Sequence, residues 1–253
     1  MIKLERPAQA PACIDGTKGG TLLALYKSTK GSVWQIEELK QALLSTTHNK
    51  CAYCETPLGV GSAYIEVEHF RHKEDFEDLA ITWSNLLPAC RRCNGKKGRH
   101  NVELDPIINP YEIDPREHFK LECCRLTPKT PLGRETLDVL ALNDTQRLGT
   151  PRWKLADSLK KAVDTCAVVL ERFKASQRTR AKNDLIGKIE DVLNECQPAS
   201  SYSATAATAL HSDTSYYAVV QGMKALGLWS AELQTLHETS RDIAFDVQGL
   251  VGP

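Results

Sequence analysis

The sequence predicts an α+β protein, in which a small metal-stabilised core of two strands and a helix follows an N-terminal helix and precedes a mainly α-helical C-terminal region. Two Cys-x-x-Cys pairs, Cys51/Cys54 and Cys90/Cys93, and a strand-like segment between them, Tyr64–Phe70, predict the core. Apolar residues at helical spacing predict the C-terminal region. We expect an N-terminal arm and helix over 1–45, the core over 46–105, a loop-rich connector over 106–142 and the helical region over 143–253.

The composition is ordinary for a globular protein of 253 residues, with 42% hydrophobic and 25% charged residues. The formal net charge is +0, so any affinity for nucleic acid must come from local patches or from a partner. No apolar run is long enough to span a membrane, and the N-terminus lacks the apolar centre of a signal peptide. We therefore expect a cytoplasmic protein, in which the cysteines outside the two pairs are free thiols. These are Cys13, Cys123, Cys124, Cys166 and Cys196.

The N-terminal part is predicted to be an arm followed by one helix. Residues 1–20 contain two prolines and end in Lys-Gly-Gly, which predicts an extended segment. A helix is predicted from Ser32, as its N-cap, to about Leu44. Its apolar residues recur at roughly helical spacing and are expected to pack in the core: Trp34, Ile36, Leu39 and Leu43.

The two cysteine pairs predict a structural zinc site. Two residues between cysteines let both thiolates point at one tetrahedral ion, and two such knuckles complete a closed four-thiolate site. A single pair would leave a redox pair or ordinary buried cysteines open, but two pairs around a short insert favour Zn²⁺. The insert has few apolar residues, so the metal would supply much of its stability. The predicted zinc ligands are Cys51, Cys54, Cys90 and Cys93.

Between the pairs lies one acidic-histidine dipeptide, Glu68-His69, on the predicted strand. Neighbouring residues of a strand point to opposite faces, unless a bulge or the strand end redirects one of them. A site that uses both side chains therefore requires such a bulge near His69. Taken alone, the dipeptide is more simply a surface glutamate beside a half-buried histidine. It is not alone, because Asn85 precedes the second cysteine pair and Asn94 follows it directly.

In this order, with the knuckles, these residues resemble the HNH endonucleases, which have the ββα-metal fold. The resemblance covers about residues 50–100. It implies that His69 is the general base and that Glu68 and Asn94 are ligands of a catalytic metal ion. It also implies that Asn85 holds the loop and the base in position, so that all four residues belong to the catalytic site.

Hydrolysis of a phosphodiester bond is consistent with these residue types. A neutral imidazole near its working pKa can take a proton from the attacking water. A hard divalent ion, Mg²⁺ or Mn²⁺, can stabilise the developing charge, and it prefers oxygen ligands such as a carboxylate or an amide. Soft thiolates would keep zinc in the other site. Two metal sites of different kinds are therefore expected.

A basic run without acidic residues overlaps the second cysteine pair and is predicted to bind DNA phosphates. The alternative is a solvated charged face, but the run adjoins Asn94. Its members are Arg91, Arg92, Lys96, Lys97 and Arg99. His72 and His100 are interpreted as plain surface histidines. Four acidic residues after the dipeptide are interpreted as a solvated turn: Glu74, Asp75, Glu77 and Asp78.

The rest of the chain is predicted to carry no chemistry of its own. The proline-rich connector is expected to contain a hairpin, Phe119–Glu122 with Arg125–Thr127, and a helix from Gly133 to Leu142. A Ser/Ala/Thr-rich loop is expected over 196–213. Helices are predicted over 151–175, 179–194, 216–226 and 229 to about 247. Trp229, beside Leu226 and Leu228, belongs either to a surface patch that binds a partner or to the hydrophobic core.

The opening IKLERP and the stretch from LDP to LALN are similar to one group of HNH endonucleases, the Septu-type (PtuB-like) nuclease subunits. This resemblance implies a role in antiphage defence and an ABC-type ATPase subunit (PtuA-like) as partner. In retron systems of this kind, a reverse transcriptase and its DNA would be further partners. The helical region would then dock to a partner or simply pack on the nuclease core.

Two other functional classes compete with a metal-dependent endonuclease. A non-catalytic zinc-binding module for nucleic acid or protein explains the cysteines and the basic run, but leaves Glu68, His69, Asn85 and Asn94 as coincidence. A zinc deaminase needs His-x-Glu followed by Pro-Cys-x-x-Cys. Here the order is Glu-His, and Ala89 separates the proline from Cys90, so this class is disfavoured.

Overall fold

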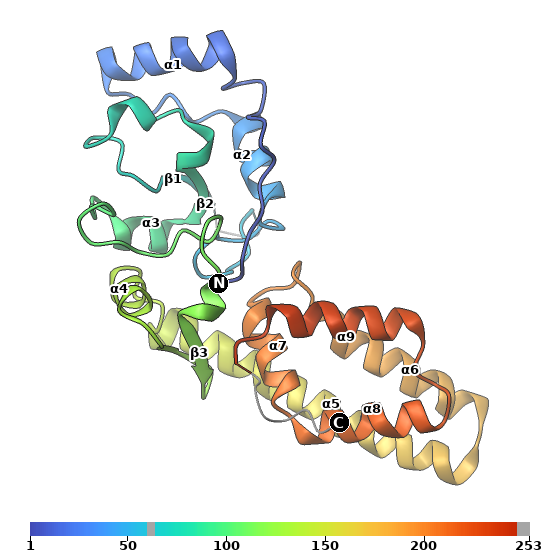
Figure 1. Ribbon diagram of the computed structural model, residues 1–253. Helices are drawn as coiled ribbons and strands as arrows, with labels where there is room; N and C mark the ends of the chain where they lie inside the picture. The colour runs from blue at the N-terminus through green and yellow to red at the C-terminus, as the bar shows by residue number, and fades with distance from the viewer. Residues whose placement is uncertain (60–63, 247–253) are drawn as a thin grey trace. The chain divides into compact units, whose positions relative to one another are not determined.

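The computed structural model describes residues 1–59 and 64–246 (Figure 1). The chain divides into two compact units. Unit 1 comprises Met1–His118 and Pro128–Leu142, and unit 2 comprises Phe119–Thr127 and the chain from Asn143 onward. The predicted connector, 106–142, therefore contributes to both units. The fold class is α+β, as predicted, since two two-stranded sheets accompany nine α-helices in the described residues.

The centre of unit 1 is an antiparallel pair of strands followed at once by a helix (Figure 1). β1 (Ile65–His69) pairs with β2 (Leu86–Cys90), and α3 (Arg91–Lys97) begins at the residue after β2. β1 is the strand predicted between the cysteine pairs. Its alternation suits a strand with one face on the core, because Val67 packs in the hydrophobic core while its neighbours do not.

The pairing of the two strands contains no bulge at the glutamate-histidine dipeptide. The register runs without interruption from Ile65 opposite Cys90 to His69 opposite Leu86. The bulge that a site using both side chains was expected to require near His69 is therefore absent from β1. His69 is instead the last residue of β1, so the strand end is what lets the chain redirect there.

Two helices precede the sheet. α1 (Gly16–Thr29) begins inside the segment 1–20, so the predicted extended arm is wrong for its last residues. Its many glycines conceal the helix, but Gly19 is required: a Cβ there would lie 2.3 Å from the carbonyl oxygen of Ile14. α2 (Glu37–Ser45) has Ile36 as its N-cap residue, so the predicted start at Ser32 is also wrong.

The hydrophobic core of unit 1 gathers side chains from α1, α2 and both strands. Its members come from these elements and from the segments that join them, and they include Tyr26, Trp34, Leu39, Leu43, Val67, Ile81, Trp83 and Leu86. Trp34 is buried, as predicted. Burying this apolar surface is the main force that holds the sheet against the helices.

The remaining parts of unit 1 lie along this core. The extended N-terminal residues are held by main-chain contacts, since Leu4 N donates to the Pro110 carbonyl oxygen at 2.9 Å. Trp83 Nε1 donates to the Pro7 carbonyl oxygen at 2.9 Å. α4 (Pro131–Val139) follows an N-cap threonine and spans most of the predicted helix.

Unit 2 contains one hairpin, at the predicted place. β3 (Phe119–Glu122) pairs with β4 (Arg125–Pro128). The adjacent pair Cys123-Cys124 forms the turn, with φ of 47° and 62°. Two consecutive residues with positive φ make the type of two-residue turn that matches the twist of a hairpin. This turn explains the place of the unusual cysteine pair.

The rest of unit 2 is a helical bundle (Figure 1). Its helices are α5 (Thr150–Ser176), α6 (Thr179–Asn194), α7 (Ser203–His211), α8 (Thr214–Ala225) and α9 (Ala231–Ile243). The long α5 contacts α6, α7 and α8, and α9 contacts α6 and α7. The predicted helices are all found, although the last runs from Ala231 to Ile243 instead of from 229 to about 247. Residue 247 itself lies outside the described residues.

Two predictions for unit 2 need correction or resolution. The predicted loop over 196–213 is wrong, because it contains α7, whose small residues are nearly all buried between other helices. Trp229 is half-buried and packs against the core of the bundle, with its indole nitrogen donating to Gln234 Oε1 at 2.8 Å. Trp229 therefore belongs to the packing of the bundle core.

Across residues 1–59 and 64–246, no helix combines the length and apolar character needed to cross a membrane.

Candidate active site and metal centre

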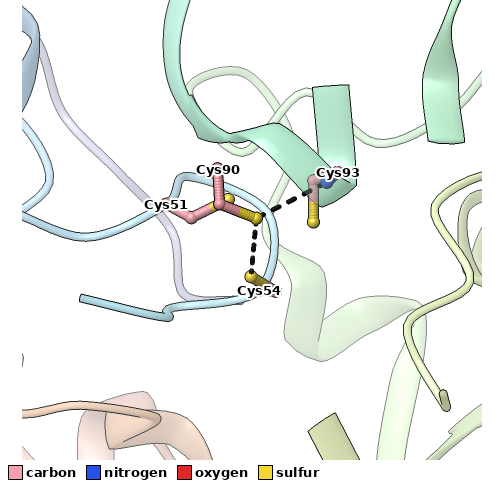
Figure 2. A group of neighbouring side chains, drawn as sticks. All are labelled: Cys51, Cys54, Cys90 and Cys93. Carbon is pink, nitrogen blue, oxygen red and sulfur yellow. Dashed lines mark hydrogen bonds between the residues drawn. The ribbon is translucent and has the colours of Figure 1, made fainter. Parts of the chain in front are cut away.

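The four cysteines of the two pairs come together in unit 1 (Figure 2). Cys51 and Cys54 lie on the turn before β1, Cys90 ends β2, and Cys93 lies in the first turn of α3. Their sulfurs all lie within 4.8 Å of one another. Cys54 and Cys90 are 3.7 Å apart, close to the ~3.8 Å between neighbouring sulfurs of a tetrahedral site with zinc–sulfur bonds of about 2.3 Å. The donor set and spacing thus fit a zinc ion.

A separate pocket of about 500 Å³ lies between β1 and α3. It is the place where three of the four predicted catalytic residues meet: Glu68, His69 and Asn94 line it. Arg91 also lines it, and so does Glu66, a residue to which the sequence motif assigns no role. The fourth residue, Asn85, lies outside the pocket. The pocket therefore collects carboxylate, amide and imidazole groups.

Glu68 is buried and ion-paired. Its Oε1 lies 2.7 Å from Lys97 Nζ, and the same ammonium donates to the His69 carbonyl oxygen at 2.9 Å. Burial raises the pKa of Glu68, and the positive charge of Lys97 opposes this rise. The side chain of Lys97 has no exposed surface. The prediction that Lys97 binds nucleic acid is therefore wrong, because a buried ammonium cannot reach a phosphate.

His69 is held in one orientation. Its Nε2 lies 3.0 Å from the Ala80 carbonyl oxygen, and its ring meets Trp34 edge-on at 4.4 Å between centroids. Because a carbonyl oxygen only accepts hydrogen bonds, Nε2 carries the proton and Nδ1 keeps a free lone pair. Burial lowers the pKa of His69 to about 3, so the imidazole is neutral at physiological pH. The expectation of a pKa near the working pH is not met.

Asn85 makes three hydrogen bonds to the loop between the strands. Its Oδ1 accepts from Arg71 N at 2.7 Å, and its Nδ2 donates to the carbonyl oxygens of Arg71 and Leu79 at 3.0 Å and 3.1 Å. This loop also carries Ala80, the partner of His69. The contacts are those that a loop-holding residue needs, and the functional role of Asn85 stays a prediction.

Asn94 is linked to Glu66, a residue that the sequence analysis missed. The Nδ2 of Asn94 donates to Glu66 Oε2 at 2.6 Å. Since its amide nitrogen is used in this way, its Oδ1 is the atom left to bind a cation. The period of two along a strand could have revealed Glu66, because it shares a face with Glu68.

The predicted basic run splits into different environments. Arg91 and Lys96 are exposed and have no ion pair among the described residues. Arg92 donates to the Ala141 carbonyl oxygen. Arg99 is exposed and pairs with Glu74 at 2.9 Å and Asp75 at 2.8 Å. Arg91 and Lys96 are thus the side chains best placed to meet a phosphate.

The two histidines outside the motif and the four acidic residues after the dipeptide lie in different surroundings. His72 lines the pocket, whereas His100 Nε2 bonds to the Asp105 carbonyl oxygen at 2.6 Å. The acidic turn after His69 pairs with surface bases, including Lys30 with Glu77. Within residues 1–59 and 64–246, only the four-cysteine cluster brings three or more Cys, His, Asp or Glu ligand atoms close together. A second cluster in the acidic turn is therefore absent from the described structure.

Comparison with known proteins identifies the family. A profile described as HNH endonuclease matches residues 51–100, which hold both the cysteine cluster and the pocket residues of β1 and α3. The Septu protein PtuB of Bacillus thuringiensis is 37% identical over 238 residues, which cover 93% of this chain and 92% of that protein. The chain belongs to the PtuB family. Septu protein PtuB of Bacillus mycoides (strain KBAB4) is 26% identical to this PtuB-family chain over 239 residues, 77% of this chain and 80% of that protein.

No solved structure matches this PtuB-family chain. The predicted resemblance to HNH endonucleases of the PtuB group is confirmed, and the chain is an HNH endonuclease. A non-catalytic module is accordingly disfavoured. HNH nucleases use divalent metal ions, so the family and the pocket chemistry agree on the need for such an ion.

Proposed function

We propose that this PtuB-family chain hydrolyses phosphodiester bonds of DNA with a divalent metal ion, Mg²⁺ or Mn²⁺, as the nuclease subunit of an antiphage system. The observation that carries the proposal is the fixed imidazole of His69 beside a pocket lined with carboxylate and amide groups. A structural Zn²⁺ would occupy the four-cysteine cluster.

Each residue in and around the pocket would have its own role in the reaction. His69 would take the proton of the attacking water on Nδ1, the nitrogen that its bond to Ala80 leaves free. Asn85 would keep the loop that carries Ala80 in place. Arg91, at the pocket, and Lys96, on the exposed side of α3, would meet the phosphates on either side of the cut.

The metal ion would be held by pocket oxygens. The donor set fits a hard divalent cation, because Glu68 and Asn94 offer a carboxylate and an amide oxygen. When bound, such an ion supplies charge stabilisation at the phosphorus and at the departing oxygen. Burial lowers the pKa of His69, so its imidazole is neutral and carries the lone pair that a general base needs.

The partner in this proposal is an ATPase of the PtuA type. The chain has a formal net charge of +0, and two of the five bases of the predicted run are exposed without an ion pair. Such a surface favours DNA binding together with another subunit over tight binding alone. Neither relative's name refers to a retron, so no retron component is included. The proposal also places the protein in a reducing cytoplasm, where the four cysteines of the cluster stay available as thiolates for zinc.

Cleavage of supercoiled plasmid tests this function. Wild type is assayed with Mg²⁺, Mn²⁺ or EDTA, alone and with an ATPase encoded next to it. Cutting that requires the metal and falls by about 10²-fold or more in His69→Ala is expected, since a positioned general base contributes that much. His100→Ala is the matched control, because this imidazole bonds to a carbonyl outside the pocket.

Two results would contradict the proposal. If His69→Ala cut as fast as wild type, His69 would not be the base. If folded, zinc-loaded wild type cut no DNA with any metal or with the partner, the proposed activity on DNA would be wrong.

A further inference from the structure

We propose that Glu66 is a ligand of the divalent metal ion in the pocket of β1 and α3, beside Asn94 and Glu68. The inference rests on the proposed metal-dependent function and extends it, since the sequence motif points only to Glu68 and Asn94. It starts from the place of Glu66 on β1, two residues before Glu68 and therefore on the same face of the strand.

The first support is geometric. Glu66 lines the same pocket as Glu68 and Asn94. Its Oε2 accepts the Asn94 amide at 2.6 Å, so the carboxylate and the Asn94 side chain are neighbours within the pocket. With its nitrogen donating to Glu66, Asn94 is left with its oxygen as the free donor atom. A cation between the two side chains would meet two oxygen donors, the type that Mg²⁺ and Mn²⁺ prefer.

The second support is charge. The carboxylate of Glu68 is already neutralised by Lys97, whose Nζ lies 2.7 Å away with no exposed surface. A divalent ion beside this neutral pair would gain little attraction from it, because the charges of Glu68 and Lys97 oppose each other. Glu66 has no basic partner among the described residues, so its negative charge is available. With Glu66 included, the pocket offers a carboxylate that no ion pair within the described residues neutralises, beside the carboxylate of Glu68 that is paired with Lys97.

The third support is the difference in burial between the two glutamates. Glu68 is 3% exposed and forms part of a buried ion pair, whereas Glu66 is only half-buried and open to the pocket. A ligand that exchanges between water and a metal ion needs such access. Glu68 and Lys97 together also hold the end of β1, because Lys97 donates to the His69 carbonyl oxygen. We assign Lys97 the role of a positioning residue.

The test measures binding of Mn²⁺ to the full, zinc-loaded chain. The concentration of Mn²⁺ that stays free is read from its electron paramagnetic resonance signal. Glu66→Gln keeps an oxygen that accepts the Asn94 amide but removes the charge. We expect it to weaken Mn²⁺ binding by about tenfold or more, because ligand charge sets affinity for hard cations. Glu66→Asp keeps the charge and is expected to retain more affinity than Glu66→Gln.

Matched variants separate a ligand from a structural residue. Glu117→Gln removes the same charge from an exposed position of unit 1 outside the pocket, and it is expected to bind Mn²⁺ as wild type does. Zinc content and melting temperature are measured for every variant, so that a misfolded protein is recognised. Should Glu66→Gln not fold, Glu66→Ala replaces it, and Mn²⁺ affinity equal to that of wild type in this variant would overturn the inference.

The outcomes distinguish this inference from the proposed function. If Glu66→Gln bound Mn²⁺ as tightly as wild type while wild type cut DNA, Glu66 would only orient Asn94, and the inference alone would fail. If wild type neither bound Mn²⁺ in an Asn94-dependent way nor cut DNA, the proposed function would fail as well. Weakened binding in Glu66→Gln, with zinc and melting unchanged, is the result that supports the inference.

Discussion

Glu68 forms a buried ion pair with Lys97, so this residue of the pocket also contributes to the stability of the folded protein. Replacing Glu68 with leucine would leave the ammonium of Lys97 without its counter-charge in a place with no exposed surface. Removing one partner of a buried ion pair costs about 3–5 kcal/mol of unfolding free energy. We expect this loss for Glu68→Leu in urea unfolding of zinc-loaded protein. Loss of cleavage in a Glu68 variant is therefore not evidence of metal binding by itself.

The double variant Glu68→Leu with Lys97→Met is the control for this prediction. It removes both charges and keeps the approximate volume, so it is expected to regain most of the stability lost in Glu68→Leu. A single Glu68→Leu variant as stable as wild type would show that the ion pair contributes nothing to the fold.

For single residues, the sequence was enough to predict the motif residues but not which side chains contact them in the fold. Glu68, His69 and Asn94 line one pocket because the strand-strand-helix order brings them together. Lys97 was assigned to a basic surface because a run of bases shows charge and not burial. Only the fold reveals that position 97, the last of α3, turns toward the sheet.

Among the elements, the cysteine cluster joins the turn before β1 to the end of β2 and the start of α3. The turn is also held by the buried side chain of Tyr53 and by a hydrogen bond from Ala52 N to the Pro88 carbonyl oxygen at 2.9 Å, but four thiolates brought together need a cation to balance their charge. Cys54→Ser is therefore expected to bind less than a full equivalent of zinc and to unfold unit 1 at a lower temperature. Zinc analysis and thermal unfolding measure this.

Cys123→Ser is the matched control for the zinc prediction. Cys123 is exposed on the turn of the hairpin in unit 2 and is not a member of the four-cysteine cluster. This variant should keep its zinc and its melting temperature. A Cys54→Ser protein with full zinc content would overturn the four-thiolate assignment.

The elements that the sequence missed share one physical property. α1 contains several glycines, and α7 is a run of small residues in which serine, threonine and alanine alternate. Such residues are weak local signals for a helix, and tertiary packing decides their conformation. In α7 the small side chains are buried against α5 and α9, where larger ones would not fit. The hairpin and α5 were predictable because their signals are local and strong.

At the scale of the whole molecule, each unit has a hydrophobic core of its own. The core of unit 1 includes Trp34 and Leu86, and that of unit 2 includes Leu185 and Tyr216. The four-cysteine cluster belongs to the first unit. The response of the second unit to solution conditions is therefore set by its own buried groups.

The buried groups that matter in unit 2 are two histidines. His211 Nε2 lies 2.8 Å from Ser240 Oγ, and its Nδ1 lies 3.2 Å from the Tyr217 hydroxyl. His237 Nδ1 lies 2.6 Å from the Tyr216 hydroxyl. Burial is the main cause that lowers the pKa of His211 to about 3 and that of His237 to about 4. Both are neutral in the native state down to this range.

Acid should therefore weaken unit 2 well before its carboxylates titrate. Above pH 6.5 both histidines are neutral in folded and unfolded chains, so stability is full; below it, the unfolded chain takes up protons that the folded one excludes. For His211 the loss is about 2 kcal/mol at pH 5, and it grows until the pH approaches 3. Hydrogen exchange of α7–α9 amides, corrected for intrinsic rates, measures it. His211→Asn should shrink the difference between pH 7 and pH 5 by that amount, and an unchanged difference would exclude His211 as its source.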